Sequence, residues 1–235
     1  MYGDRGAFSR TPAWHQLGTV FQGAKTLKEI ITLAKCDYAL TAEPIYVMLD
    51  GNYIDCNDRV AIVRHANYDD PTPVVLEVVS SSYQLVTNLQ LVEYYNELSE
   101  RYSVETMGAL RNGATFFFTL DAGEVEINGG LVHQYFLVTD NKTATQQTRI
   151  VYTPVKVVCQ NTLTTGLRQA TFNMGVPHRT GNHERLQEIA GLVVQMEDGI
   201  QQVNKLFGDM GKSYVKLEEF KELVEQLYPI DDDET

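Results

Sequence analysis

The sequence is short of positive charge, of tryptophan and of cysteine, and it contains no long hydrophobic run. Its 235 residues include 19 Lys and Arg against 31 Asp and Glu, one Trp and three Cys, and the formal net charge is −12. No run of about 18 apolar residues is present, which excludes an encoded membrane-spanning helix. The N-terminus lacks the charged and apolar regions of a secretory signal. We therefore expect a soluble, cytoplasmic protein.

The cysteines and glycines exclude several classes of site. Cys36, Cys56 and Cys159 are odd in number and far apart, which fits neither a disulfide framework nor paired zinc ligands. The glycines form no phosphate-binding or dinucleotide-binding fingerprint, because none shows the required spacing ahead of a helix. We expect no cofactor and no metal, and no catalytic residue is assigned.

Local patterns predict both helices and strands. Thr26 to Glu29 has the form of a capping box before a helix reaching Cys36, and Thr87 or Asn88 is a candidate cap for a helix to about Arg101. Asp50-Gly51 lies between β-prone runs, as in a hairpin. The unbroken run 116–118 of three phenylalanines indicates a strand covered on both faces. The sequence thus predicts an α+β fold: a mainly antiparallel meander sheet of seven to nine strands, covered by helices.

The later part of the chain predicts further helices. Val155 to Leu167 is compatible with a buried helix or a strand, and we favour the helix. Asn182 is a candidate N-cap. From Leu186 to Phe207, apolar residues alternate in steps of three and four, forming a seam that needs a facing helix, either the last helix of the chain or a second copy. We expect a core domain at 1–182, a C-terminal helical hairpin at 183–229 and a disordered acidic tail at 230–235.

Positive charge gathers in one segment of this acidic chain. Residues 141–186 hold six basic residues and one acidic residue, a net charge of +5, whereas residues 187–235 carry −8. Clustered cations attract phosphate, and aromatic faces hold unstacked bases. The candidate nucleic-acid-binding residues are Arg149, Tyr152, Lys156, Arg168, Arg179 and Arg185. Phe172 and Trp14 are further stacking candidates. Pairing of these cations with the protein's own carboxylates is the competing explanation.

Other residues suggest chemistry less strongly. Cys159 could be a thiolate nucleophile if His15 or His178 lay nearby, but it also fits a buried position at the start of a helix. His178 and His183 are five residues apart, which matches no standard zinc pair. Glu124 and Glu126 share one side of a predicted strand and could hold a hard cation, as could any half-exposed strand with alternating acids.

Two separated motifs carry a family resemblance. Residues 14–19 read Trp-His-Gln-Leu-Gly-Thr, and residues 157–163 read Val-Val-Cys-Gln-Asn-Thr-Leu. Together with Ser82-Tyr83-Gln84 and the step from His178 to Thr180, they make residues 10–230 resemble the phage/plasmid-like protein family, a domain of unknown function carried by mobile elements. The resemblance implies a viral or plasmid protein of the host cell cytoplasm with a role in DNA metabolism. It supplies no activity and no catalytic residues.

These observations favour a non-enzymatic protein that binds or anneals single-stranded nucleic acid for a phage or plasmid, as in recombination. The expected partners are single-stranded DNA and further copies of the chain. The alternative is an acidic protein-binding accessory factor that blocks or redirects a host system, as an anti-defence protein or DNA mimic. A thiol-dependent or metal-dependent enzyme is the third hypothesis.

Overall fold

The computed structural model describes residues 5–10, 18–67, 70–127, 130–170, 172–195, 202, 205–206, 209 and 216–227. The chain divides into two compact units. The first unit comprises residues 1–124 and 133–197, and the second comprises residues 125–132 and 198–235. No helix in the described part of the chain is long and apolar enough to cross a membrane.

Seven strands form the main sheet, in the order β10-β9-β8-β7-β6-β1-β2. They are β1 (Arg5–Ser9), β2 (Thr19–Phe21), β6 (Val104–Leu110), β7 (Thr115–Ile127), β8 (Gly130–Asn141), β9 (Thr148–Thr153) and β10 (Phe172–Val176). Strands β6 to β10 follow one another in the chain and in space. β1 pairs with β2 in parallel, whereas the β1–β6, β6–β7, β8–β9 and β9–β10 pairs are antiparallel. The predicted α+β class with a mainly antiparallel meander is confirmed.

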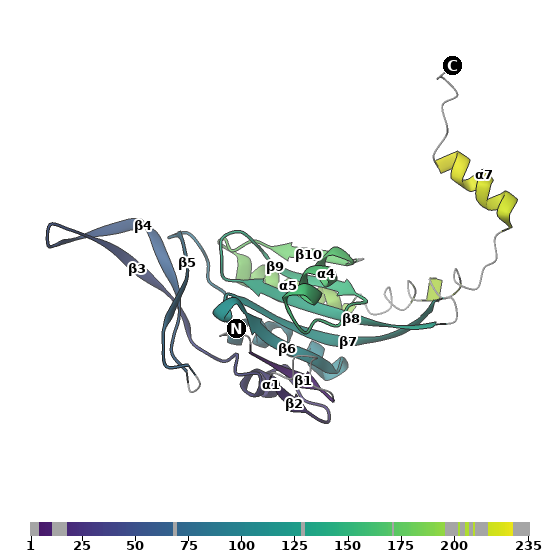
Figure 1. Cartoon of the computed structure of the whole chain (residues 1–235), viewed down its shortest axis with the longest axis horizontal. Helices are drawn as coiled ribbons and strands as arrows, with labels where there is room; N and C mark the ends of the chain where they lie inside the picture. Colours follow the sequence, from purple (N-terminus) through teal and green to yellow (C-terminus); the bar gives the residue numbers. More distant parts are fainter. Residues whose placement is uncertain are drawn as a thin grey trace, which may run out of the picture. The chain divides into compact units, whose positions relative to one another are not determined.

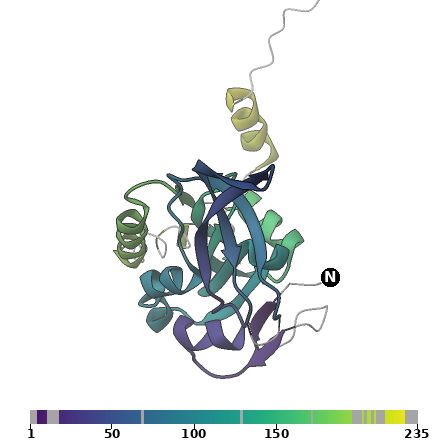
Figure 2. The same ribbon diagram turned by 90° about the vertical axis from the view of Figure 1, so that its left-hand side faces the viewer.

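Helices cover both faces of this sheet. They are α1 (Leu27–Leu33), α2 (Asn88–Tyr95), α3 (Leu98–Arg101), α4 (Gln160–Arg168) and α5 (Asn182–Gln195). Phe117 packs with Val151 and Leu163 beneath α4, whereas the ring of Phe118 meets that of Tyr95 on α2. Neighbouring residues of a strand point to opposite faces, so α4 lies on one face and α2 on the other. α5 packs with α2, and Figure 2 shows α4 and α5 on opposite sides of the sheet.

A second sheet of three strands has the order β3-β4-β5. Its strands are β3 (Leu40–Leu49), β4 (Asn52–Arg64) and β5 (Val74–Ser80). Asp50 and Gly51 have φ of 49° and 79°, the left-handed pair that a tight two-residue hairpin turn requires. The predicted hairpin is confirmed, but the separate short runs expected on either side are two long strands. Figure 1 shows this hairpin extending away from the main sheet. Counting both sheets, the described residues form ten strands instead of seven to nine.

The predicted helix starts at Thr26 and Thr87 are confirmed, while other predicted helix limits differ. Thr26 with Glu29 and Thr87 with Gln90 form complete capping boxes. α1 ends at Leu33, short of Cys36, because the backbone turns into the left-handed region at Lys35 (φ 56°). The helix expected over Val155 to Leu167 begins only at Gln160. The residues ahead of it are held in an extended approach, where the Val158 and Cys159 amides donate to Thr162 Oγ1.

The two predicted C-terminal helices belong to different units. α5 packs against α2 and β10 in the first unit, with Leu186 and Val193 buried. The Asn182 side chain donates to the Gln84 carbonyl, which joins α5 to the preceding core. α7 (Leu217–Leu227) belongs to the second unit. The later seam residues Met196, Ile200, Val203 and Phe207 lie outside the described residues. Pairing of the two helices as a hairpin therefore stays a prediction, as do the domain limits at 182 and 229.

Candidate nucleic-acid interface

Four arginines of the positively charged segment surround the edge strand β10. Arg149 on β9 is opposite Gly175 of β10. Arg168 ends α4 four residues before β10, Arg179 follows β10 by three residues, and Arg185 lies in the early part of α5. Arg149 is half-buried and the other three are exposed. Among the described residues, no carboxylate lies within ion-pair distance of any of the four.

These arginines lie on both sides of the sheet. Arg149 points to the same face as Val151, which packs beneath α4, because alternate residues of a strand share a face. Arg168 is on α4 itself, whereas Arg185 is on α5, across the sheet. The four arginines therefore do not form one patch on a single face of the sheet. What the four share is the β10 edge, and we call them the arginine rim.

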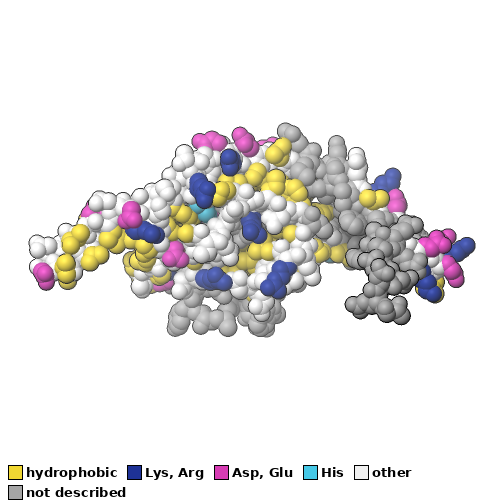
Figure 3. Space-filling view, turned by 90° about the horizontal axis from the view of Figure 1, so that it is seen from above, with side chains coloured by type: hydrophobic (Ala, Val, Ile, Leu, Met, Phe, Trp, Pro, Cys, Tyr) yellow, Lys and Arg dark blue, Asp and Glu magenta, His cyan; other side chains and the backbone are white. Residues whose placement is uncertain are grey.

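In Figure 3, Lys and Arg side chains are spread over the surface, separated by uncharged and hydrophobic side chains. Residues 141–186 contain one acidic residue, Glu184. The rim is thus a local accumulation of basic residues on a strongly acidic protein. At ordinary salt, the electric field of an acidic residue is largely screened beyond about 8–10 Å, so distant carboxylates affect the rim little.

Lys156 is not part of the rim. Its Nζ donates to Glu105 Oε2 at 2.6 Å, and Arg10 donates to the other carboxylate oxygen at 2.6 Å. The Glu105 side chain is almost fully buried. Burial would raise the pKa of Glu105, but hydrogen bonds and charge interactions with Lys156 and Arg10 outweigh burial and lower it. Lys156 is therefore engaged in neutralising a buried carboxylate, which leaves less of its charge for an external phosphate.

The expected stacking residues differ in accessibility. Tyr152 is only 6% exposed, and its ring lies 5.4 Å from that of Phe136, so it presents no open face to a base. The sequence pattern does not indicate this burial, because β9 is a short strand in which residues on both faces are buried. Phe172, at the start of β10 and opposite Tyr152, is half-buried. Trp14 and His15 lie outside the described residues.

A second basic residue of the segment, Lys142, is fully buried in a polar cluster. Lys142 donates to Asp140 and to the Val86 carbonyl, and Thr148 donates to the other oxygen of Asp140. His178 Nε2 lies 3.2 Å from Asp140 Oδ1, although the two atoms are not aligned as a hydrogen bond. Burial would raise the pKa of Asp140, but Lys142 and His178 lower it far below its usual range. Asp140 and Lys142 are two residues apart, a spacing that places both on one face of a strand and could have indicated the pair.

His178 holds the start of α5 in place beside this cluster. Its Nδ1 is 3.2 Å from the Gln84 carbonyl, which can only accept, so Nδ1 carries a proton. The Tyr83 ring stacks on the imidazole with centroids 4.6 Å apart. The next residue is Arg179 of the rim. The buried cluster therefore fixes the backbone that presents one rim arginine to solvent.

A cavity of about 420 Å³ opens next to Arg179. Its lining is polar and lacks carboxylates: it comes from residues 80, 82 and 83, from the loop 144–147, and from residues 177–179. Ser80, Ser82, Thr145 and Gln146 supply hydroxyl and amide groups there. Uncharged donors beside a guanidinium suit an anionic group such as phosphate.

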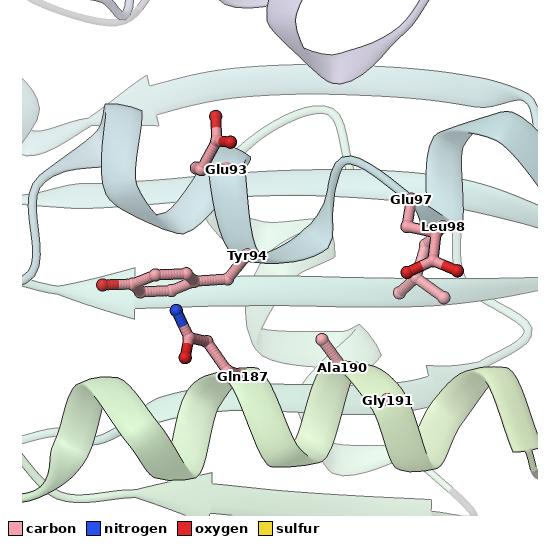
Figure 4. Close-up of a pocket in the computed structure, with 7 residues that line it drawn as sticks. All are labelled: Glu93, Tyr94, Glu97, Leu98, Gln187, Ala190 and Gly191. Atoms are coloured by element: carbon pink, nitrogen blue, oxygen red, sulfur yellow. The ribbon is translucent and has the colours of Figure 1, made fainter.

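A smaller hollow of about 330 Å³ lies between α2 and α5. Figure 4 shows Tyr94 and Gln187 facing each other across it, with Ala190 and Gly191 on the α5 side. Glu93 and Glu97 also line this hollow, and Glu93 Oε2 forms an ion pair with Lys28 Nζ at 2.6 Å. The two carboxylates make it unsuitable for phosphate, so the arginine rim and its adjoining cavity form the better candidate site.

The residues considered for catalysis are not brought together. Cys159 is at the start of α4, with its Sγ 3.5 Å from Thr162 Oγ1, whereas His178 contacts Asp140 on the opposite face of the sheet. His183 Nδ1 is 2.6 Å from the Tyr94 hydroxyl. Glu124 pairs with His133 at 2.6 Å, and the Glu126 side chain lies outside the described residues. No group of three or more potential metal ligands occurs in the described part of the chain.

Comparison with known proteins gives one family. A family model described as a domain of unknown function, DUF932, matches residues 75–235. The chain belongs to this family. The matched region contains β10 and the whole arginine rim, whereas the β3–β4 hairpin lies outside it. No curated protein and no solved structure matches the chain.

Proposed function

We propose that this DUF932 protein binds single-stranded nucleic acid at the arginine rim, without catalytic turnover. The observation that carries the proposal is the position of Arg149, Arg168, Arg179 and Arg185 around one sheet edge, free of described carboxylate partners. Guanidinium groups bind phosphate in a forked geometry and remain charged at all physiological pH values. The polar cavity beside Arg179 can accept a phosphate or a sugar hydroxyl.

The arrangement favours a single strand over a duplex. The rim cations lie on both sides of the sheet, so a ligand that contacts all of them must bend around the β10 edge. Duplex DNA is stiff over about 150 base pairs and resists such a bend. A single strand can follow the edge while half-buried Phe172 contacts one of its bases.

The phage/plasmid resemblance supports a biological setting. We propose that the protein acts in the DNA metabolism of a mobile element, where annealing of single strands is needed during recombination. The resemblance to that family is carried by the motifs at residues 14–19 and 157–163. Annealing would be seen as faster pairing of complementary strands in the presence of the protein. If the strands are bound but pair no faster than alone, the annealing part of the proposal is wrong.

The binding proposal is tested by fluorescence anisotropy with labelled single-stranded and double-stranded oligonucleotides. The double variant Arg168→Gln/Arg179→Gln should lose roughly tenfold or more in single-strand affinity, because two phosphate contacts are removed. The control is Arg59→Gln/Arg111→Gln, which removes the same charge from exposed positions on β4 and after β6. Equal losses in the two double variants would contradict the proposal. Absence of any binding would favour the acidic accessory-factor hypothesis instead.

A further inference from the structure

The end of the β3–β4 hairpin exposes large hydrophobic side chains. We call residues 43–58 the arm. Tyr53 is 76% exposed and Met48 is 68% exposed, and Tyr46, Val47, Leu49 and Ile54 are about half exposed. Figure 3 shows hydrophobic side chains along this projecting part of the molecule. Patches of this kind on a folded protein mark a surface that another molecule covers.

Both faces of the arm are apolar. Met48 is paired with Tyr53, and Val47 is paired with Ile54. Because successive residues of a strand alternate, these two pairs lie on opposite faces of the hairpin. A bare two-stranded hairpin is only marginally stable in water. The arm therefore needs a partner that packs on it, because β5 pairs with β4 only from Arg59 to Arg64, beyond the arm.

Charge distinguishes between possible partners. The arm contains Glu43, Asp50, Asp55 and Asp58 and no basic residue, a net charge of −4. Packing the arms of two copies against each other would bring eight carboxylates together. The arginine rim has the opposite charge and also follows a sheet edge. β3 and β10 are both edge strands in the described sheets, so each has an unpaired row of backbone groups.

We propose that the arm of one copy packs along the β10 edge of a second copy, with the arm carboxylates facing the arginine rim. Such a contact joins two different surfaces, so two copies can exchange arms as a closed pair, or the contact can repeat from copy to copy in a ring or filament. The six apolar side chains of the arm contribute on the order of 500 Å² of surface, which is more than half of the roughly 800 Å² that each partner buries in a typical specific interface.

This inference goes beyond nucleic-acid binding but shares the rim with it. A bound strand and a neighbouring arm both need the rim arginines, so each weakens the other. Variants of the arm remove only self-association, whereas variants of the rim affect both. The two proposals can therefore fail separately.

The test is the solution mass of the full chain, measured by light scattering over a range of salt concentrations. The wild-type chain should be oligomeric at low salt and should dissociate as salt rises, because opposite charges are screened. Met48→Thr/Tyr53→Thr should be monomeric and should bind single-stranded oligonucleotide at least as tightly as the wild-type chain, because no arm then competes for its rim. The control Val75→Thr/Val78→Thr removes exposed apolar side chains from β5, and it should leave the mass unchanged.

Charge reversal identifies the surfaces that meet. Asp50→Arg/Asp55→Arg should be monomeric, and mixing it with Arg168→Glu/Arg179→Glu should restore mixed oligomers. A wild-type chain that is monomeric at low salt would overturn the inference. An oligomer that strengthens with salt, or one that persists in Met48→Thr/Tyr53→Thr, would overturn it equally, since either result points to a different interface.

Discussion

At the scale of single residues, burial decides which basic side chains are available to a ligand. Lys142 and Lys156 belong to the same positively charged segment as the rim arginines. The structure uses Lys142 to neutralise buried Asp140 and Lys156 to neutralise buried Glu105. Sequence position alone does not distinguish these two lysines from Arg168 or Arg179, because only the folded chain brings a buried carboxylate next to each lysine.

Lys142→Met should lower the free energy of unfolding by about 3–5 kcal/mol, because it leaves the Asp140 carboxylate buried without its main partner. The measurement is urea denaturation near neutral pH. The control Asp140→Asn/Lys142→Met removes both charges, and it should lower the free energy of unfolding clearly less than Lys142→Met does. A loss below about 1 kcal/mol in the single variant would show that the pair contributes little to stability.

The same pair predicts a pH dependence. The pKa of Asp140 is lower in the folded protein than in the unfolded chain, so its carboxylate contributes stability above the unfolded value of about 4. This contribution is lost as the pH falls below that value toward the folded pKa. Urea midpoints of the wild-type chain should therefore fall below about pH 4 more steeply than those of Asp140→Asn/Lys142→Met. Parallel profiles would contradict the assignment.

Lys156→Gln should affect stability more than binding. Glu105 would keep Arg10 but lose one of two charged hydrogen bonds, at a cost of about 1–2 kcal/mol in the free energy of unfolding. Its affinity for single-stranded oligonucleotide should change less than that of Arg179→Gln, measured side by side. If Lys156→Gln weakens binding as much as Arg179→Gln does, the ion pair with Glu105 does not prevent Lys156 from contacting phosphate.

At the scale of elements, local signals were predictive and long-range ones were not. The capping boxes at Thr26 and Thr87 and the turn at Asp50-Gly51 depend on a few adjacent residues, and the structure confirms them. The sequence pattern predicts too early a start for α4, because the Val158 amide donates to Thr162 Oγ1 and the backbone ahead of Gln160 is not helical. The division into two sheets depends on pairing between distant strands, which local patterns do not specify.

The candidate site was predictable only in part. The accumulation of arginines in residues 141–186 was visible in the sequence, and the structure places four of them around β10. The shared position of these arginines at a sheet edge depends on β10 being an edge strand, and the order of strands in the sheet decides this. The burial of Tyr152 likewise depends on the ring of Phe136, which lies on a neighbouring strand.

Two glycines allow a matched test of the packing. Gly191 lies in α5, and a Cβ added there meets no atom within 4 Å, so Gly191→Ala should raise the free energy of unfolding by about 0.5–1 kcal/mol. Gly113 has φ of 98°, and an added Cβ would lie 2.8 Å from Arg64 Cδ and from the Tyr38 hydroxyl. Gly113→Ala should therefore lower the free energy of unfolding by at least about 1–2 kcal/mol. Thermal or urea denaturation of both variants measures the contrast, and equal effects would contradict these backbone assignments.

At the scale of the whole molecule, opposite charges are segregated onto two sheet edges. The arm carries acidic and apolar side chains, and the β10 edge carries the arginine rim. A net charge of −12 would by itself repel nucleic acid. Binding is possible because the rim acts at short range, where the distant carboxylates are screened. Self-association through the arm and strand binding at the rim are therefore both expected to weaken with salt, but through different residues.

The most direct test of the central claim is the salt dependence of single-strand binding, measured for the wild-type chain and for Arg168→Gln/Arg179→Gln. Each phosphate contact contributes a slope of about −0.7 to the plot of log affinity against log salt for a single strand. Four rim arginines predict a slope of about −3 for the wild-type chain, and two predict about −1.5 for the variant. Equal slopes for the two proteins, or an affinity that does not change with salt, would contradict nucleic-acid binding at the arginine rim.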